Sequence, residues 1–133
     1  MNSDLLDERV KSLLAHRGSA AGFVYAETSD GRTIVASDID MTSVDKYQIF
    51  AVSDTKNYLI LEFPLSVVGD GPHEVKAPID TRRWILALDG VRHGPDGMAV
   101  FTLRDDRNTL HGVIDLVIES GVRVVGGFYI RGN

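Results

Sequence analysis

The sequence predicts an all-β, mainly antiparallel fold: a single-domain β-sandwich or closed β-barrel of about 8–9 strands with one N-terminal amphipathic helix. Two observations lead to this prediction. From about residue 20 onward, segments rich in Val, Ile, Phe and Tyr alternate with turn residues about every eight to twelve positions, which is typical of antiparallel strands. Helical periodicity is confined to the start of the chain. We therefore expect an N-terminal helix within 1–18 and an antiparallel β domain over 19–133, together forming one globular unit.

The N-terminal segment has the pattern of an amphipathic helix over 4–17. Its large apolar residues recur at spacings of about three and four and form one stripe: Leu5, Leu6, Val10, Leu13 and Leu14. Ser3 or Asp4 can cap the start, and Gly18 supplies a C-terminal stop. Such a helix must bury its stripe, either on the β domain or against a second copy of itself.

The first expected hairpin joins segment 21–28 to segment 32–39. The dipeptide Asp30-Gly31 lies between them and suits a two-residue turn, because both residue types tolerate positive φ angles. The sequence therefore predicts two long paired strands at the start of the β domain.

A second hairpin is expected between 46–53 and 58–65. If a four-residue loop over 54–57 closes it, Phe50 and Val52 share one face with three residues of the following strand, Leu59, Leu61 and Phe63. The opposite face is also apolar, since it holds Ile49, Ala51 and Ile60. We expect these two strands to be central and covered on both sides.

The C-terminal hairpin permits the most detailed prediction. Its alternating apolar residues must share one face: Leu110, Ile114, Leu116, Ile118, Val122, Val124, Phe128 and Ile130. Directly opposed residues point the same way, so Ile118 faces Val122 across a three-residue loop that ends at Gly121. The same register opposes three further pairs, Gly112 with Phe128, Gly126 with Ile114, and His111 with Tyr129.

The other face of this hairpin carries mainly polar side chains: His111, Asp115, Glu119, Arg123, Tyr129 and Arg131. A solvated face explains them most simply. Four of them are nevertheless candidates for binding a ligand or partner, because they combine an exposed aromatic ring with hydrogen-bond donors and acceptors: His111, Tyr129, Asp115 and Arg123.

Shorter strands are expected near 73–77, 82–89 and 98–105. Trp84 alternates in step with the apolar residues Leu86 and Leu88 of its strand, so we place it on the same face, in the core. The stretch 90–97 is interpreted as a connector that turns through Pro95-Asp96-Gly97. Arg92 and His93 lie at its tip without a structural reason, which makes them candidates for contacting a partner.

Composition and charge narrow the function. The chain has 133 residues, no cysteine and a net charge of -5, a sign that disfavours binding to nucleic acid through phosphates. The acidic residues near the N-terminus do not match a secretory signal, and no apolar run approaches the roughly 20 residues that span a bilayer. We therefore expect a cytoplasmic protein that binds neither nucleic acid nor membrane.

Catalytic signatures are weak throughout. His73, His93 and His111 would hold a divalent metal if they converged, but their spacing matches no metal motif, so we expect neither a metal nor another cofactor. Turns explain most of the carboxylates that an acid/base hydrolase would need, which are Asp89, Asp96, Asp105, Asp106 and Asp115. The chain also lacks a G-x-S-x-G elbow and a phosphate-binding loop.

Three functions remain as hypotheses. The first is a non-enzymatic protein-interaction module, for example an acidic inhibitor or immunity-type protein, or one that assembles with its own copy. The second is a small-ligand or carbohydrate-binding barrel or sandwich. The third is a metal-dependent or acid/base hydrolase.

Overall fold

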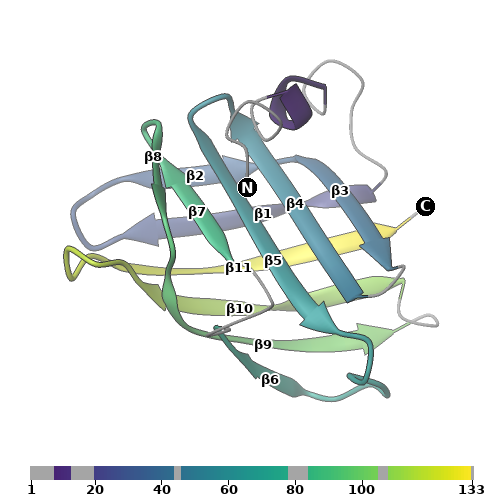
Figure 1. Cartoon of the computed structure of the whole chain (residues 1–133). Helices are drawn as coiled ribbons and strands as arrows, with labels where there is room; N and C mark the ends of the chain where they lie inside the picture. The colour runs from purple at the N-terminus through teal and green to yellow at the C-terminus, as the bar shows by residue number, and fades with distance from the viewer. Residues whose placement is uncertain (1–7, 13–19, 44–45, 78–83, 105–107, 133) are drawn as a thin grey trace.

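A single antiparallel sheet forms the body of the protein in the computed structural model (Figure 1), which describes residues 8–12, 20–43, 46–77, 84–104 and 108–132. Its strands are β1 (Ala20–Thr28), β2 (Thr33–Ala36), β3 (Asp38–Ser43), β4 (Lys46–Asp54), β5 (Asn57–Pro64), β6 (His73–Lys76), β7 (Ile85–Leu88), β8 (Val91–His93), β9 (Asp96–Arg104), β10 (Thr109–Val117) and β11 (Arg123–Gly132). Their order across the sheet is β6-β9-β10-β11-β1-β3-β4-β5-β7-β8, and β2 pairs with β1 off this path.

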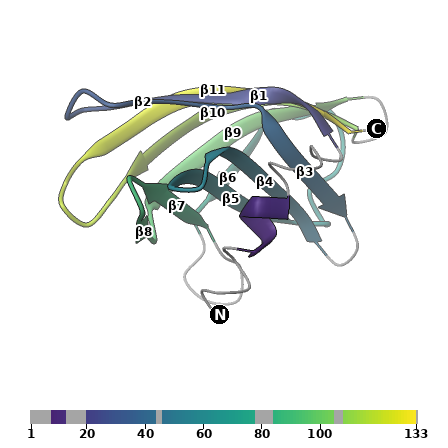
Figure 2. The same cartoon turned by 90° about the horizontal axis from the view of Figure 1, so that it is seen from above.

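The sheet is curled into a half-barrel with β6 and β8 at its edges. Figure 2 shows β1, β2, β10 and β11 as one curved layer, with β4, β5 and β7 in a second layer opposite it. Strand β3 connects the two layers, because it pairs with both β1 and β4. The predicted all-β class with a small N-terminal helix is confirmed, and the architecture is one continuous curled sheet. The described part of the chain contains no helix with the length and apolarity needed to cross a membrane.

The main core lies between the two layers and contains the inward-facing residues of both. Phe101 lies near its middle, with its ring centroid 4.6 Å from that of Phe63 and 6.3 Å from that of Phe128. Trp84 is buried here as predicted, and its indole Nε1 donates a hydrogen bond to the backbone oxygen of Glu62 at 3.0 Å. Because the indole N–H finds this partner, the large ring is buried without an unpaired donor.

A smaller apolar cluster lies on the outer face of β4, β5 and β7, away from the main core. It contains Phe50, Val52, Tyr58, Ile60 and Ala87, and Val10 of the helix 8–12 covers it. Arg9 lies over the Phe50 ring at 4.6 Å, and its guanidinium is 3.7 Å from a carboxylate oxygen of Asp40. Val10 is therefore buried on the β domain, whereas the other four residues of the expected stripe lie outside the described residues.

The predicted register of the β4–β5 hairpin is wrong by one residue. Asp54 pairs directly with Asn57, and the register shifts between Val52 and Asp54, so an extra residue interrupts β4. The Asp54 carboxylate holds the turn, because it accepts hydrogen bonds from the backbone N–H of Lys56 at 2.8 Å and from the side chain of Asn57. The Asp54–Asn57 pair itself keeps the predicted register, and the extra residue after Val52 shifts the rest of the strand. A slip of one residue exchanges the two faces. Phe50 and Val52 thus lie outside, while the prediction that this pair is covered on both sides is confirmed.

The predicted two-residue turn between β1 and β2 is also wrong. Glu27 pairs with Thr33, and the backbone N–H of Thr28 donates to Arg32 O at 2.9 Å, which leaves a three-residue loop over 29–31. Within this loop only Gly31 has a positive φ, and the Asp30 side chain accepts hydrogen bonds from Thr28 and Arg32. Segment 32–39 is moreover divided into β2 and β3 instead of forming one strand.

The connector expected over 90–97 contains a strand of its own. Asp89 and Gly90, both with positive φ, form a two-residue turn that folds β8 back onto β7. Leu86 pairs with His93, and Ala87 pairs with Arg92. The expected connector is therefore wrong over 91–93, and the dipeptide Asp89-Gly90 is the sequence signal for this hairpin, since Asp-Gly favours such turns.

The C-terminal hairpin follows the predicted register throughout. Gly121 has a φ of 82°, and the backbone N–H of Ile118 donates to Val122 O at 3.0 Å. The three opposed pairs, Gly112 with Phe128, Gly126 with Ile114, and His111 with Tyr129, are all confirmed. The glycines also allow other strands to approach closely. A Cβ at Gly126 would lie 1.8 Å from Tyr25 O of β1, and a Cβ at Gly112 would lie 2.3 Å from Val100 O of β9.

Candidate interaction surface

The outer side of β1, β2, β10 and β11 carries a cluster of exposed apolar side chains, which we call the open apolar face. Its members are Phe23, Tyr25, Val35, Val113, Val117, Val125 and Tyr129. The strand registers place them together, since directly paired residues in a sheet point the same way. The alternate residues of the same strands face inward, and most of them belong to the main core.

Two rows of paired residues make up the centre of this face. In the first, Phe23 pairs with Tyr129, and Tyr129 pairs with His111, whose ring centroid lies 5.7 Å from that of Tyr129 in an edge-to-face arrangement. In the second row, Gly127 lies between Tyr25 and Val113. Gly127 therefore contributes no side chain between these two larger neighbours.

Charged groups at this face are held in local pairs. Two guanidinium nitrogens of Arg123 donate to the two carboxylate oxygens of Asp115, at 3.0 and 2.8 Å. These hydrogen bonds, together with the positive charge, hold the pKa of Asp115 below its ordinary value. The hydroxyl of Tyr25 donates to Glu27, and this hydrogen bond is the main reason that the pKa of Tyr25 is raised.

Four of the six predicted binding residues therefore lie on one surface. His111 and Tyr129 lie in one row, and Asp115 and Arg123 lie further along β10 and β11 on the same side. The sequence prediction missed the apolar majority of this surface. The available signal was that β1, β10 and β11 carry large apolar residues at both odd and even positions, as in Phe23-Val24-Tyr25.

The other two predicted residues, Arg92 and His93, lie on edge strand β8 and contact the protein itself. Arg92 Nε donates to the hydroxyl of Tyr58 at 2.6 Å. His93 Nδ1 donates to Glu119 Oε1 at 2.9 Å, a contact that joins β8 to the β10–β11 loop and lowers the pKa of Glu119. Both side chains thus have a structural reason that the expected connector did not provide.

The three histidines considered for metal binding lie in different settings. His73 pairs with Phe101, and its Nε2 donates to Gly69 O at 2.7 Å. His111 pairs with Thr102, the next residue along β9, and therefore points to the opposite side of the sheet from His73. His93 contacts Glu119. Within the described ranges, no group of three His, Cys, Asp or Glu side chains is placed to hold a metal ion.

The carboxylates considered for acid/base chemistry have turn or pairing partners. Asp115 is bound by Arg123, Asp89 contacts Arg32, and Asp96 accepts a hydrogen bond from the backbone N–H of Gly97. Asp105 and Asp106 lie outside the described residues.

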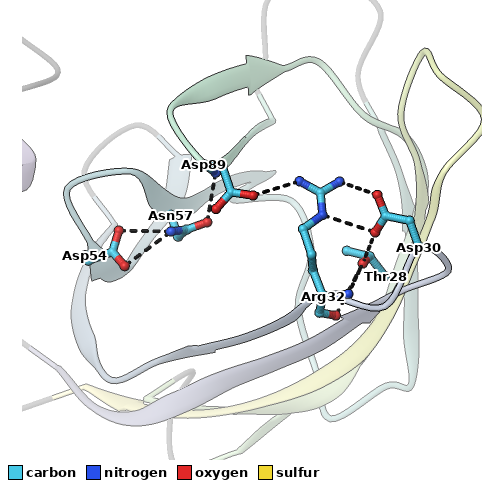
Figure 3. A network of polar contacts seen from close by, with 6 residues as sticks. All are labelled: Thr28, Asp30, Arg32, Asp54, Asn57 and Asp89. Atoms are coloured by element: carbon cyan, nitrogen blue, oxygen red, sulfur yellow. Dashed lines mark hydrogen bonds and ion pairs between the residues drawn. The ribbon is translucent and has the colours of Figure 1, made fainter.

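A polar network joins three turns at one end of the half-barrel (Figure 3). Arg32 of the β1–β2 turn lies between Asp30 and Asp89, at nitrogen–oxygen distances of 2.7 and 3.2 Å. Asn57 Oδ1 accepts a hydrogen bond from the backbone N–H of Asp89 at 3.0 Å, which connects the β4–β5 and β7–β8 turns. These groups stabilise the turns against one another and thereby fix the end of the barrel.

No family model, no curated protein and no solved structure matches the chain at a significant level. Function is therefore argued from the surface chemistry. Phe, Tyr and Val side chains offer contact area, and aromatic residues are enriched in the buried centres of protein interfaces. The paired Asp115 and Arg123 suit the polar rim of such a contact. These side chains are suited to binding another macromolecule.

Proposed function

We propose that this chain is a non-enzymatic cytoplasmic protein-interaction module that binds its partner through the open apolar face. One observation supports the proposal most strongly: of the nine exposed large apolar side chains of the described residues, seven lie on this one side of the sheet. Isolated apolar residues are common on protein surfaces, but contiguous apolar patches are rare on monomers and typically mark interaction sites.

The proposal is tested by photo-crosslinking in the native cell. A benzophenone amino acid at position 113 is expected to form a defined protein adduct. The control carries the same group at position 68, since Val68 and Val113 are similarly exposed, at 53% and 55%, and Val68 lies in the β5–β6 connection, outside the strands that form the face. Equal labelling from both positions, or no adduct from either, would reject the open apolar face as an interaction site.

A second candidate is carbohydrate binding, for which the exposed rings of Phe23, Tyr25 and Tyr129 provide the specific support. Sugar rings can stack on exposed aromatic faces, and Asp115 and Arg123 lie on the same side to form hydrogen bonds. A thermal-shift screen over glycans tests it, because a ligand that binds only the folded state raises its melting temperature. Stabilisation that disappears in Tyr129→Ala would favour this candidate over protein binding.

A further inference from the structure

We infer that the occupant of the open apolar face is a second copy of this chain, stacked sheet against sheet around a two-fold axis. The inference rests on the proposed function and deepens it by naming the partner. Three properties of the face support self-association: its area, its charge balance and its shape.

The first property is area. At exposed fractions of 39–55%, the three aromatic and four valine side chains together leave several hundred Å² uncovered, since each aromatic side chain alone has about 150–250 Å². A standard interface buries about 800 Å² on each partner, of which a little over half is apolar. The face therefore offers enough apolar surface for a stable dimer and lies at the upper end of what monomers expose.

The second property is charge. The chain carries a net charge of -5, so two copies repel each other unless the surfaces that meet are neutral. The outward positions of β1, β2, β10 and β11 carry two acidic and two basic residues, Glu27, Asp115, Arg123 and Arg131, and so balance to zero with His111 neutral. A strongly basic partner would gain little from this face. A second copy meets no net repulsion there.

The third property is shape. An isologous interface requires a surface that is complementary to itself, because the same patch occurs on both sides. The open apolar face provides both parts of such a fit: the exposed rings of Phe23, Tyr25 and Tyr129, and the position of Gly127, which carries no side chain. Only Gly112 O and a methyl group of Val113 lie within 4 Å of where a Cβ of Gly127 would be.

Sedimentation analysis of the full chain over about 1–200 μM tests the inference, a range that detects micromolar dissociation constants. We expect the mass to rise from 14.6 kDa towards twice that value. Val113→Asp and, independently, Tyr129→Glu are expected to raise the dissociation constant at least about tenfold, since each substitution buries a charge twice in the dimer. Val68→Asp serves as the matched control and is expected to leave the dimer intact. Circular dichroism confirms that each variant is folded.

The outcomes separate the inference from the proposed function. A chain that stays at 14.6 kDa throughout overturns the self-association, as does a dimer that Val113→Asp and Tyr129→Glu leave unchanged while folded. If a monomeric chain still forms a position-113 crosslink to a different protein, the interaction function stands and only the identity of the partner changes. If no position-113 crosslink forms at all, both fail.

Discussion

The outer sides of the two layers carry similar apolar side chains, but one is covered by the N-terminal helix and the other is exposed. On β4, β5 and β7, residues such as Phe50 and Ile60 are buried beneath Val10 of the N-terminal helix. On β1, β10 and β11, residues such as Phe23 and Val113 remain exposed. An apolar outer face requires a cover, because each large side chain gains about 1.5–3 kcal/mol on leaving water. The chain covers one face itself and leaves the other exposed, where we propose that a second copy binds.

The largest expected difference comes from truncating one phenylalanine on each face. Phe50→Ala is expected to lower the free energy of unfolding by about 3–5 kcal/mol, because it leaves a cavity under the helix. Phe23→Ala is expected to change it by less than about 1 kcal/mol in dilute solution. Urea denaturation at low protein concentration measures both. Similar losses would mean that the two faces are covered to the same extent.

A second comparison uses two adjacent glycines of β11 that point to opposite sides. Gly126→Ala is expected to destabilise the fold by about 3 kcal/mol, because its Cβ would lie 1.8 Å from Tyr25 O and separate β1 from β11. Gly127→Ala points to the open apolar face, where the nearest atom is Gly112 O at 3.0 Å, so we expect a loss nearer 1 kcal/mol. Thermal melts of both variants show which substitution destabilises the fold more. A larger loss of stability from Gly127→Ala than from Gly126→Ala would refute the assignment of the two glycines to opposite faces.

The cover over β4 and β5 is tested within the helix itself. Val10→Ala is expected to lower the free energy of unfolding by about 2 kcal/mol, because Val10 is 1% exposed and the substitution removes two buried carbons. The exposed neighbouring Lys11 provides a control, and Lys11→Ala should stay within about 0.5 kcal/mol of the parent. Equal stabilities of the two variants in urea would show that the helix does not stabilise the face beneath it.

The smallest expected effect concerns the ion pair on the open apolar face. Because the pKa of Asp115 is lowered in the folded state, the pair stabilises the protein above the unfolded pKa of about 3.9 and loses this contribution as the pH falls through the folded value. Arg123→Gln is expected to move the pKa of Asp115 up towards its ordinary value and to weaken the loss of stability on acidification. Carboxyl NMR titration measures the shift. An unchanged titration of Asp115 would show that Arg123 does not hold it in solution.

The sequence predicted most where one strand face is clearly more apolar than the other. In the C-terminal hairpin, alternation together with the loop glycine Gly121 determines a single register, and the structure has that register. In β4 and β5 both faces are apolar, so alternation could not distinguish registers that differ by one residue. The extra residue between Val52 and Asp54 decides between them, because it shifts the register by one from Val52 onward, and spacing alone does not specify such a bulge.

The candidate surface was predicted in part for a similar reason. His111, Asp115, Arg123 and Tyr129 lie together on one side of β10 and β11, as the alternation of side chains along the two strands predicted. The contribution of β1 could not be predicted, since the order of strands in the sheet is a long-range property. The pairing of β1 with β11 is what places Phe23 next to Tyr129 and makes the surface contiguous.

Hydroxyl-radical footprinting over a concentration series tests most directly whether a second copy covers the open apolar face. Phe23, Tyr25 and Tyr129 react readily when exposed, and we expect their labelling to fall as the protein concentration rises. Val68 and Val91, exposed elsewhere at 53% and 56%, should be labelled equally at every concentration. Labelling of the three aromatic residues that stays constant across the series would contradict the dimer.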